Sequence, residues 1–199
     1  ALARMALAQQ YFNLPAPGFV VLNASRPDAR KRIDLTLAGF AQFAARLPEH
    51  VYLCLHHAIV PDEVRDGLRA QARDLGIEAR ILWSPHQAGP IDDHALNALY
   101  NACALGLNTA LGEGFGLVSF EHAATGVPQL LPAHPALREL WVDAAQFLGP
   151  VRTVQAPSLP LLMGEIDASA VCAGLRQLYD NGAEYLRLAE ATLRRARAP

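Results

Sequence analysis

Lysine is almost absent from this chain. Of the 17 lysine and arginine residues, only Lys31 is a lysine. Since arginine is the basic residue used everywhere else, a solitary lysine indicates a position where a compact ammonium group is needed. The alternative is that the presence of a single lysine is a matter of chance.

Strong net charge and long apolar runs are also missing. The formal net charge is −2 at pH 7, which offers no electrostatic argument for binding nucleic acid or an anionic membrane. Apolar runs such as Phe19–Leu22 are far too short to span a bilayer. Segment 1–14 has no signal-peptide pattern, because an arginine and two glutamines give it an amphipathic one. We therefore expect a globular, cytoplasmic protein without a transmembrane segment.

Cysteine is scarce, and the histidines lack the spacing of a metal site. Cys54, Cys103 and Cys172 are far apart in apolar surroundings, which predicts buried thiols in a reducing compartment; a disulfide or a metal site is the alternative. His56 and His57 are adjacent, but no His-x3-His pattern with a helical carboxylate occurs. We expect neither a metal nor another cofactor.

Three catalytic signatures are absent. No P-loop occurs, which argues against ATPase chemistry of that type. The glycines of 112–116 superficially resemble a dinucleotide fingerprint, but no acid closes the next expected strand, 129–133, to bind a ribose. Ser119 lacks the Gly-x-Ser-x-Gly spacing of a nucleophile elbow. His122 is adjacent to Glu121 and should therefore lie on a different face of the helix. We expect it to pack or to lie on the surface, and not to take part in catalysis.

Short apolar segments alternate with helical patterns along the chain. This alternation predicts an α/β fold, a Rossmann-like three-layer α/β/α domain over 1–199 with a parallel sheet of about six strands. We expect a core at about 18–149, a connector or flap at 150–166 that is irregular over 151–166, and closing helices within 167–199. The expected strands are 18–23, 51–55, 79–83, 105–108, 129–131 and 145–148, and the expected core helices are 35–47 (capped by Asp34), 61–75, 92–103 (capped by Asp92 or Asp93), 117–125 and 135–140.

Four of the expected loops follow strands. Ligands of open α/β sheets bind outside the carboxyl ends of the strands. The loops 23–31, 56–61, 84–93 and 109–116 should therefore line one shared crevice.

Basic side chains are concentrated after the first strand. Arg26, Arg30, Lys31 and Arg32 fall within seven positions. Arginine forks and a lysine point charge suit a diphosphate. A solvated basic patch is the alternative, but cations at a helix start oppose the helix dipole unless an anion is present. The loop predicts a phosphate site.

Two carboxylates, Glu113 and Glu121, lie eight positions apart around a glycine-rich turn. The first should lie on a loop and the second in the first turns of a helix. Backbone N–H groups of Gly116, Leu117 and Val118 would point out of the helix start, which attracts a phosphate. Carboxylates accept hydrogen bonds from hydroxyls. The segment predicts a sugar-nucleotide pocket; the alternative for Glu121 is a helix acid that backbone donors satisfy.

These motifs resemble a known family. The string Glu-Gly-Phe-Gly-Leu at 113–117, the acid-x7-acid spacing and the basic pair Arg26 and Lys31 are similar to the C-terminal, donor-binding lobe of retaining GT-B glycosyltransferases. That group includes bacterial mannosyl- and glucosyltransferases. Segment 96–101 also resembles the helix before the motif strand, and the resemblance covers about 19–197.

The resemblance implies catalytic roles for three residues. Arg26 and Lys31 would neutralise the donor diphosphate and stabilise it as a leaving group. Glu113 would face the donor sugar and accept hydrogen bonds from its hydroxyls.

It also implies substrate-binding roles. Phe115, Gly116 and Leu117 would contact sugar or phosphate through backbone N–H groups. Glu121 would bind the ribose hydroxyls, and the base would lie near the loop after Trp83. The nucleotide could be UDP, GDP or ADP.

Two segments depart from the family pattern. The first strand ends in Asn23-Ala-Ser instead of the commoner Gly-Arg form. The loop after the fifth strand is Pro132-Ala-His134-Pro-Ala, not a glycine-bearing one, and only Glu139 fits the usual acid.

The resemblance implies one half of an enzyme. We expect a donor lobe cut from a protein about twice as long, which transfers a hexose from a nucleotide-diphosphate sugar in glycan or glycolipid synthesis. The lobe alone should bind nucleotide without transfer, because the acceptor site belongs to an N-terminal lobe, through which peripheral membrane contact is possible. Alternatives are a non-catalytic nucleotide-sugar-binding or assembly lobe, and a GT-B-like sugar-nucleotide epimerase, which should lack the spaced acids.

Overall fold

A six-stranded parallel sheet forms the centre of the molecule. The computed structural model describes residues 2–57, 61–84, 91–149, 151–155 and 160–197. The strands run in the order β3-β2-β1-β4-β5-β6, so the chain crosses over between β3 and β4, and the sheet has the three-layer Rossmann-like topology that strand–helix alternation predicts. The strands are β1 (Phe19–Asn23), β2 (Val51–Leu55), β3 (Ile81–Trp83), β4 (Leu105–Leu107), β5 (Gln129–Pro132) and β6 (Gln146–Leu148).

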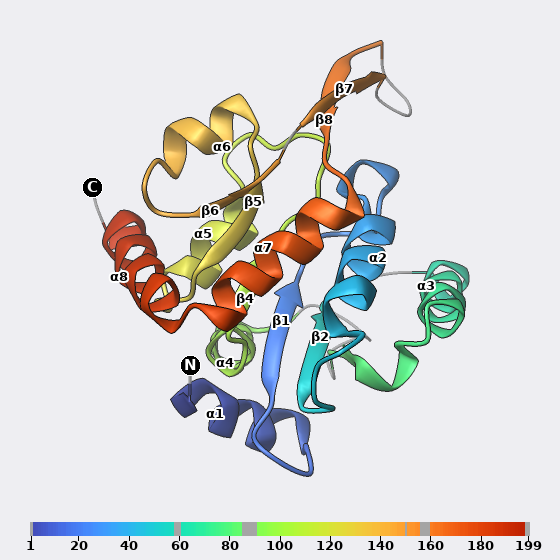
Figure 1. Cartoon of the computed structure of the whole chain (residues 1–199), viewed down its shortest axis with the longest axis vertical. Helices are drawn as coiled ribbons and strands as arrows, with labels where there is room; N and C mark the ends of the chain where they lie inside the picture. Colours follow the sequence, from blue (N-terminus) through green and yellow to red (C-terminus); the bar gives the residue numbers. More distant parts are fainter. Residues whose placement is uncertain (1, 58–60, 85–90, 150, 156–159, 198–199) are drawn as a thin grey trace.

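Helices cover both faces of this sheet (Figure 1). In β1, Phe19 and Val21 join the core under α2 and α7, whereas Val20 and Leu22 join the core under α1 and α4. This alternation follows from the two-residue period of a strand. The helices are α1 (Leu2–Phe12), α2 (Ile33–Ala44), α3 (Asp62–Asp74), α4 (Asp93–Ala102), α5 (Leu117–Ala123), α6 (Pro135–Leu140), α7 (Ala168–Asp180) and α8 (Gly182–Arg197).

Most expected elements occur at their expected positions, with local corrections. Asp92 caps α4 by accepting a hydrogen bond from the Ala95 N–H at 2.8 Å, as expected. Asp34 does not cap α2, because the helix already begins at Ile33 and Asp34 forms an ion pair with Arg32 at 2.7 Å. The expected strand over 79–83 is shorter, because a 3-10 turn occupies Glu78–Arg80.

The prediction of an irregular segment over 151–166 is wrong. Strands β7 (Arg152–Gln155) and β8 (Leu162–Glu165) form an antiparallel hairpin that projects beyond the carboxyl ends of the sheet strands (Figure 1). Gly164 N–H donates to Leu111 O at 3.0 Å. A Cβ on Gly164 would lie 2.9 Å from the His134 ring, so only glycine permits this approach. The hairpin thus packs against the loop after β4.

Two further expectations concern cysteines and membrane spans. Cys54 and Cys103 are buried free thiols, and Cys172 is a half-buried one, which confirms thiols in place of disulfides. Of the helices in the described residues, none combines the length and the hydrophobicity that crossing a bilayer requires.

Candidate functional site

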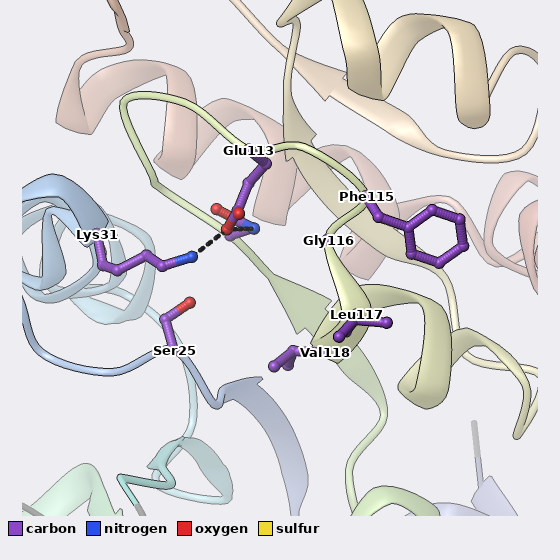
Figure 2. A pocket seen from close by; sticks show the side chains of 8 residues that line it. Ser25, Lys31, Glu113, Phe115, Gly116, Leu117 and Val118 are labelled. Atoms are coloured by element: carbon purple, nitrogen blue, oxygen red, sulfur yellow. Dashed lines mark hydrogen bonds and ion pairs between the residues drawn. The ribbon is translucent and has the colours of Figure 1, made fainter.

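A cavity of about 300 Å³ lies where β1 and β4 end. Figure 2 shows how side chains from the two strand-end loops meet across it. This is the edge of the sheet at which ligands of doubly wound folds bind. The cavity is lined by Ser25, Lys31, Asn108, Glu113, Phe115, Gly116, Leu117 and Val118.

An ion pair between Lys31 and Glu113 spans one wall of this cavity. Lys31 Nζ donates a hydrogen bond to Glu113 Oε1, and Asn108 Nδ2 donates to the same oxygen at 3.1 Å. Arg30 Nη1 lies 3.8 Å from Glu113 Oε2. The two paired side chains are only 12% and 11% exposed, so solvent screens their attraction less than at an open surface. The solitary lysine therefore lies at the strand-end cavity, and its ammonium already has an anionic partner.

Buried hydroxyls hold the backbone that carries Lys31. Thr109 Oγ1 lies 2.9 Å from the carbonyl oxygens of both Lys31 and Arg32 and 2.8 Å from Thr36 Oγ1. Asn23 Nδ2 donates to Thr36 Oγ1 at 2.8 Å. Asn23, Thr36 and Thr109 are at most 1% exposed, and buried polar groups of this kind are costly to leave unpaired. This network explains how Arg32 is held in the left-handed region, at φ 48°.

The same network supports the other side of the cavity. Asn23 Oδ1 accepts a hydrogen bond from the Ser25 N–H at 2.9 Å, and His57 Nδ1 donates to Ser25 O at 2.6 Å. Burial lowers the pKa of His57 to about 4, so its ring is neutral near pH 7, with the proton on Nδ1. These positioning groups were not predicted from the sequence; their signal was an asparagine at the end of a buried strand, Asn23 in β1 and Asn108 directly after β4.

Glu121 lies beside the cavity, not in its wall. It follows Val118, which lines the cavity, by three positions on α5 and therefore shares its helix face. Tyr100 donates from its hydroxyl to Glu121 Oε2 at 2.9 Å. Tyr100 also stacks on His122, with ring centroids 5.2 Å apart. His122 is 1% exposed, which confirms packing as its role.

Some predicted site residues meet at the cavity, and Arg26 does not. Lys31, Glu113 and the 115–117 turn lie together, as Figure 2 shows, although the Phe115 ring points away from the ion pair. Gly116 has φ 74°, a conformation that glycine adopts without strain. Arg26 is exposed and is not a lining residue; Arg30 is the arginine next to Glu113.

Two other predictions concern the remaining loops. Glu139 is exposed on α6 and does not line the cavity, whereas His134 Nε2 lies 2.7 Å from Ala110 O and so holds the loop after β4. Residues 58–60 and 85–90 lie outside the described residues. Half of the expected crevice loop at 56–61, and most of the loop at 84–93 with the base site after Trp83, therefore fall outside them.

No protein family model matches this chain. Its sequence is 28% identical over 196 residues to D-inositol 3-phosphate glycosyltransferase of Acidothermus cellulolyticus, which covers 90% of this chain and 42% of that protein. It is 28% identical over 124 residues to mannosylfructose-phosphate synthase of Agrobacterium fabrum, covering 60% and 26% of the two chains. The chain thus spans less than half the length of these relatives.

Solved structures share the fold. Sucrose-phosphate synthase from Thermosynechococcus elongatus matches with a TM-score of 0.73 and 24% identity, over 96% of this chain and 43% of that one. The C-terminal domain of a group 1 family glycosyl transferase, LpcC, from Francisella tularensis matches with a TM-score of 0.75 and 15% identity, over 98% and 91%. Anabaena Alr3699/HepE, solved with UDP and glucose, matches with a TM-score of 0.72 and 18% identity, over 98% and 48%. Relatives in sequence and neighbours in structure thus point the same way: this chain is similar to glycosyltransferases of the group 1, GT-B type, over a partial, C-terminal-like lobe.

Proposed function

We propose that this chain is the donor-substrate lobe of a retaining glycosyltransferase. Such an enzyme transfers a hexose from a nucleoside diphosphate sugar to an acceptor in glycan or glycolipid synthesis. The observation that carries the proposal is the cavity in which Lys31 and Glu113 meet beside the glycine-rich turn. The sugar-transferring relatives and the neighbour solved with UDP-glucose support it.

The proposed chemistry is largely electrostatic. When the bond between sugar and diphosphate breaks, negative charge grows on the departing diphosphate, and a nearby ammonium group stabilises it. Lys31 would take this role, with Arg30 beside it and Arg26 as a cation at the rim. Glu113 would exchange its contact with Lys31 for hydrogen bonds from hydroxyls of the donor sugar. The proposal includes no metal ion.

Glu121 and the turn complete the donor site in this proposal. Glu121 would accept hydrogen bonds from the ribose hydroxyls. Backbone N–H groups of Phe115, Gly116 and Leu117 would contact sugar or phosphate. The acceptor site would belong to a second lobe, and the 199-residue chain alone would bind the donor nucleotide without transferring the sugar.

Binding by this chain is the first test. Isothermal titration with UDP, GDP and ADP should give saturable heat with at least one of them, and added EDTA should leave that heat unchanged. The absence of heat with all three would contradict the proposed site. Sugar transfer by the isolated chain would contradict the need for a second lobe.

Transfer by a full-length protein that contains this chain is the second test. A panel of donor sugars, with products identified by mass, should yield one hexose adduct, and Glu113→Ala should abolish it. Glycan synthesis unaffected by Glu113→Ala would favour a non-catalytic binding or assembly lobe.

A further inference from the structure

A buried tyrosine holds an exposed carboxylate next to the cavity. Tyr100, near the end of α4, is 5% exposed, whereas Glu121 on α5 is exposed. The Tyr100 hydroxyl donates to Glu121 Oε2 at 2.9 Å. An exposed glutamate ordinarily samples several rotamers, and ordering it costs side-chain entropy. Here the hydrogen bond from a buried donor selects one orientation before any ligand arrives.

Tyr100 itself has little freedom to move. Its ring is stacked on that of His122, with an interplanar angle of 26°. Arg4 Nη1 donates to Asn101 O at 3.1 Å and to Tyr100 O at 3.5 Å, which ties the end of α4 to α1. The phenol therefore occupies a packed position from which its hydroxyl reaches Glu121.

We propose that Tyr100 is a positioning residue for Glu121 and that the pair sets a preference for ribose over 2′-deoxyribose in the bound nucleotide. This inference rests on the proposed function, in which Glu121 binds the ribose. A carboxylate has about four lone-pair sites, and Tyr100 occupies one of them. The remaining sites, held at a fixed angle beside Val118, can accept hydrogen bonds from both the 2′- and 3′-hydroxyls.

The test compares nucleotides that differ by one hydroxyl. Affinities of UDP and 2′-deoxy-UDP, or of the corresponding pair for whichever nucleotide binds, are measured by isothermal titration in the wild type and in Tyr100→Phe. We expect the wild type to prefer the ribonucleotide by about tenfold, as for a hydrogen bond to a charged group. Tyr100→Phe should reduce this ratio about fivefold and leave pyrophosphate affinity unchanged, because the variant keeps the ring and loses only the hydroxyl.

Tyr185→Phe is the matched control. The Tyr185 hydroxyl is also buried and donates to Ala104 O at 2.7 Å, so its loss should cost stability without changing the ratio. Should Tyr100→Phe not fold, Glu121→Asp at the exposed position tests the Glu121 half of the pair, because the shorter side chain withdraws the carboxylate from Tyr100 and from the ribose alike. The ratio should fall in that variant too.

The outcomes separate the two proposals. If the wild type binds no nucleoside diphosphate, both the proposed function and this inference fail. If it binds the ribo and deoxy forms equally, or if Tyr100→Phe or Glu121→Asp keeps the wild-type ratio, this inference is overturned while the nucleotide site stands.

Discussion

The two acids of the glycine-rich segment lie in contrasting surroundings. Glu113 is 11% exposed, is paired with Lys31 and accepts a second hydrogen bond from Asn108. Glu121 is exposed, and its carboxylate accepts a hydrogen bond from the neutral hydroxyl of Tyr100. Identical side chains eight positions apart therefore differ in what they can offer a ligand. To bind a ligand, Glu113 has to break its ion pair with Lys31, whereas Glu121 can accept further hydrogen bonds without losing its present partner.

The supports beneath the two acids also differ. On the Glu113 side of the cavity, which comprises Glu113 and its partner Lys31, the backbone is held by the Asn23–Thr36–Thr109 network. This network joins three segments that are far apart in the chain. The Glu121 side rests on Tyr100 stacked over His122. Losing one hydroxyl weakens the other hydrogen bonds of a network, because they polarise one another, whereas ring stacking does not depend on the hydroxyl.

Removing the cation of the Glu113 side should have the largest effect on binding. Lys31→Ala is expected to weaken nucleoside diphosphate binding by about 10- to 100-fold, because a hydrogen bond between charged groups contributes about 1.5–3 kcal/mol. Isothermal titration measures this loss. Arg26→Ala is the comparison variant: its side chain is exposed outside the cavity wall, so we expect a smaller loss of affinity, and a larger loss than in Lys31→Ala would place the diphosphate beside Arg26 instead.

Acid should weaken the supports on both sides. Burial lowers the pKa of His57 to about 4 and that of His122 to about 3, from 6.5. The unfolded chain therefore binds more protons below pH 6.5, so the stability that these neutral rings contribute is complete above pH 6.5 and declines as the pH falls toward 4 and 3. At pH 5 the loss is about 2 kcal/mol for each histidine.

Urea unfolding at pH 5, 6 and 7 measures this decline. His57→Gln should flatten part of the curve, since glutamine keeps an amide donor for Ser25 O and does not titrate. A wild-type stability that stays constant from pH 7 to pH 5 would contradict the burial of both rings as neutral groups.

A single hydroxyl should matter more on the Glu113 side. Thr109→Val is expected to lower the free energy of unfolding by about 1–2 kcal/mol, because it removes the partner of Thr36 and of two carbonyl groups beneath Lys31. Thr125→Val removes a hydroxyl that donates locally, to the His122 carbonyl three residues earlier at 2.7 Å, and should cost less. Urea unfolding measures both losses, and an equal loss of unfolding free energy in Thr109→Val and Thr125→Val would contradict the proposed difference between the two sides.

The smallest expected effect should appear for Glu113 and not for Glu121. Glu113→Gln should raise pyrophosphate affinity about threefold, because Lys31 no longer has a competing carboxylate. Glu121→Gln should leave pyrophosphate affinity unchanged, since Lys31 is paired with Glu113 and Glu121 is hydrogen-bonded to Tyr100. Isothermal titration of both variants with pyrophosphate measures these affinities. A reduced affinity in Glu113→Gln would contradict the prediction and show that the ion pair prepares the site for phosphate.

Most of the fold was predictable because its elements are local. The apolar runs of β1 and β2 and the Asp92 cap of α4 lie in contiguous residues, so propensity and periodicity predict them. The β7–β8 hairpin was missed because each strand has only four residues and Pro160 precedes β8. The position of the hairpin depends on long-range contacts such as that of Gly164 with Leu111, and local sequence patterns cannot predict such contacts.

The candidate site divides in the same way. By itself, the sequence determined the α/β class, the carboxyl-end location and the chemical types gathered there: a lone lysine, spaced acids and a glycine turn. Tertiary structure decided which of these groups meet. A 3-10 turn at Ala29–Lys31, capped by Asp28, aims Arg30 and Lys31 at Glu113 and leaves Arg26 exposed. Partners 82 positions apart are selected by how loops from different strands pack, and that packing depends on the whole sheet, not on either segment alone.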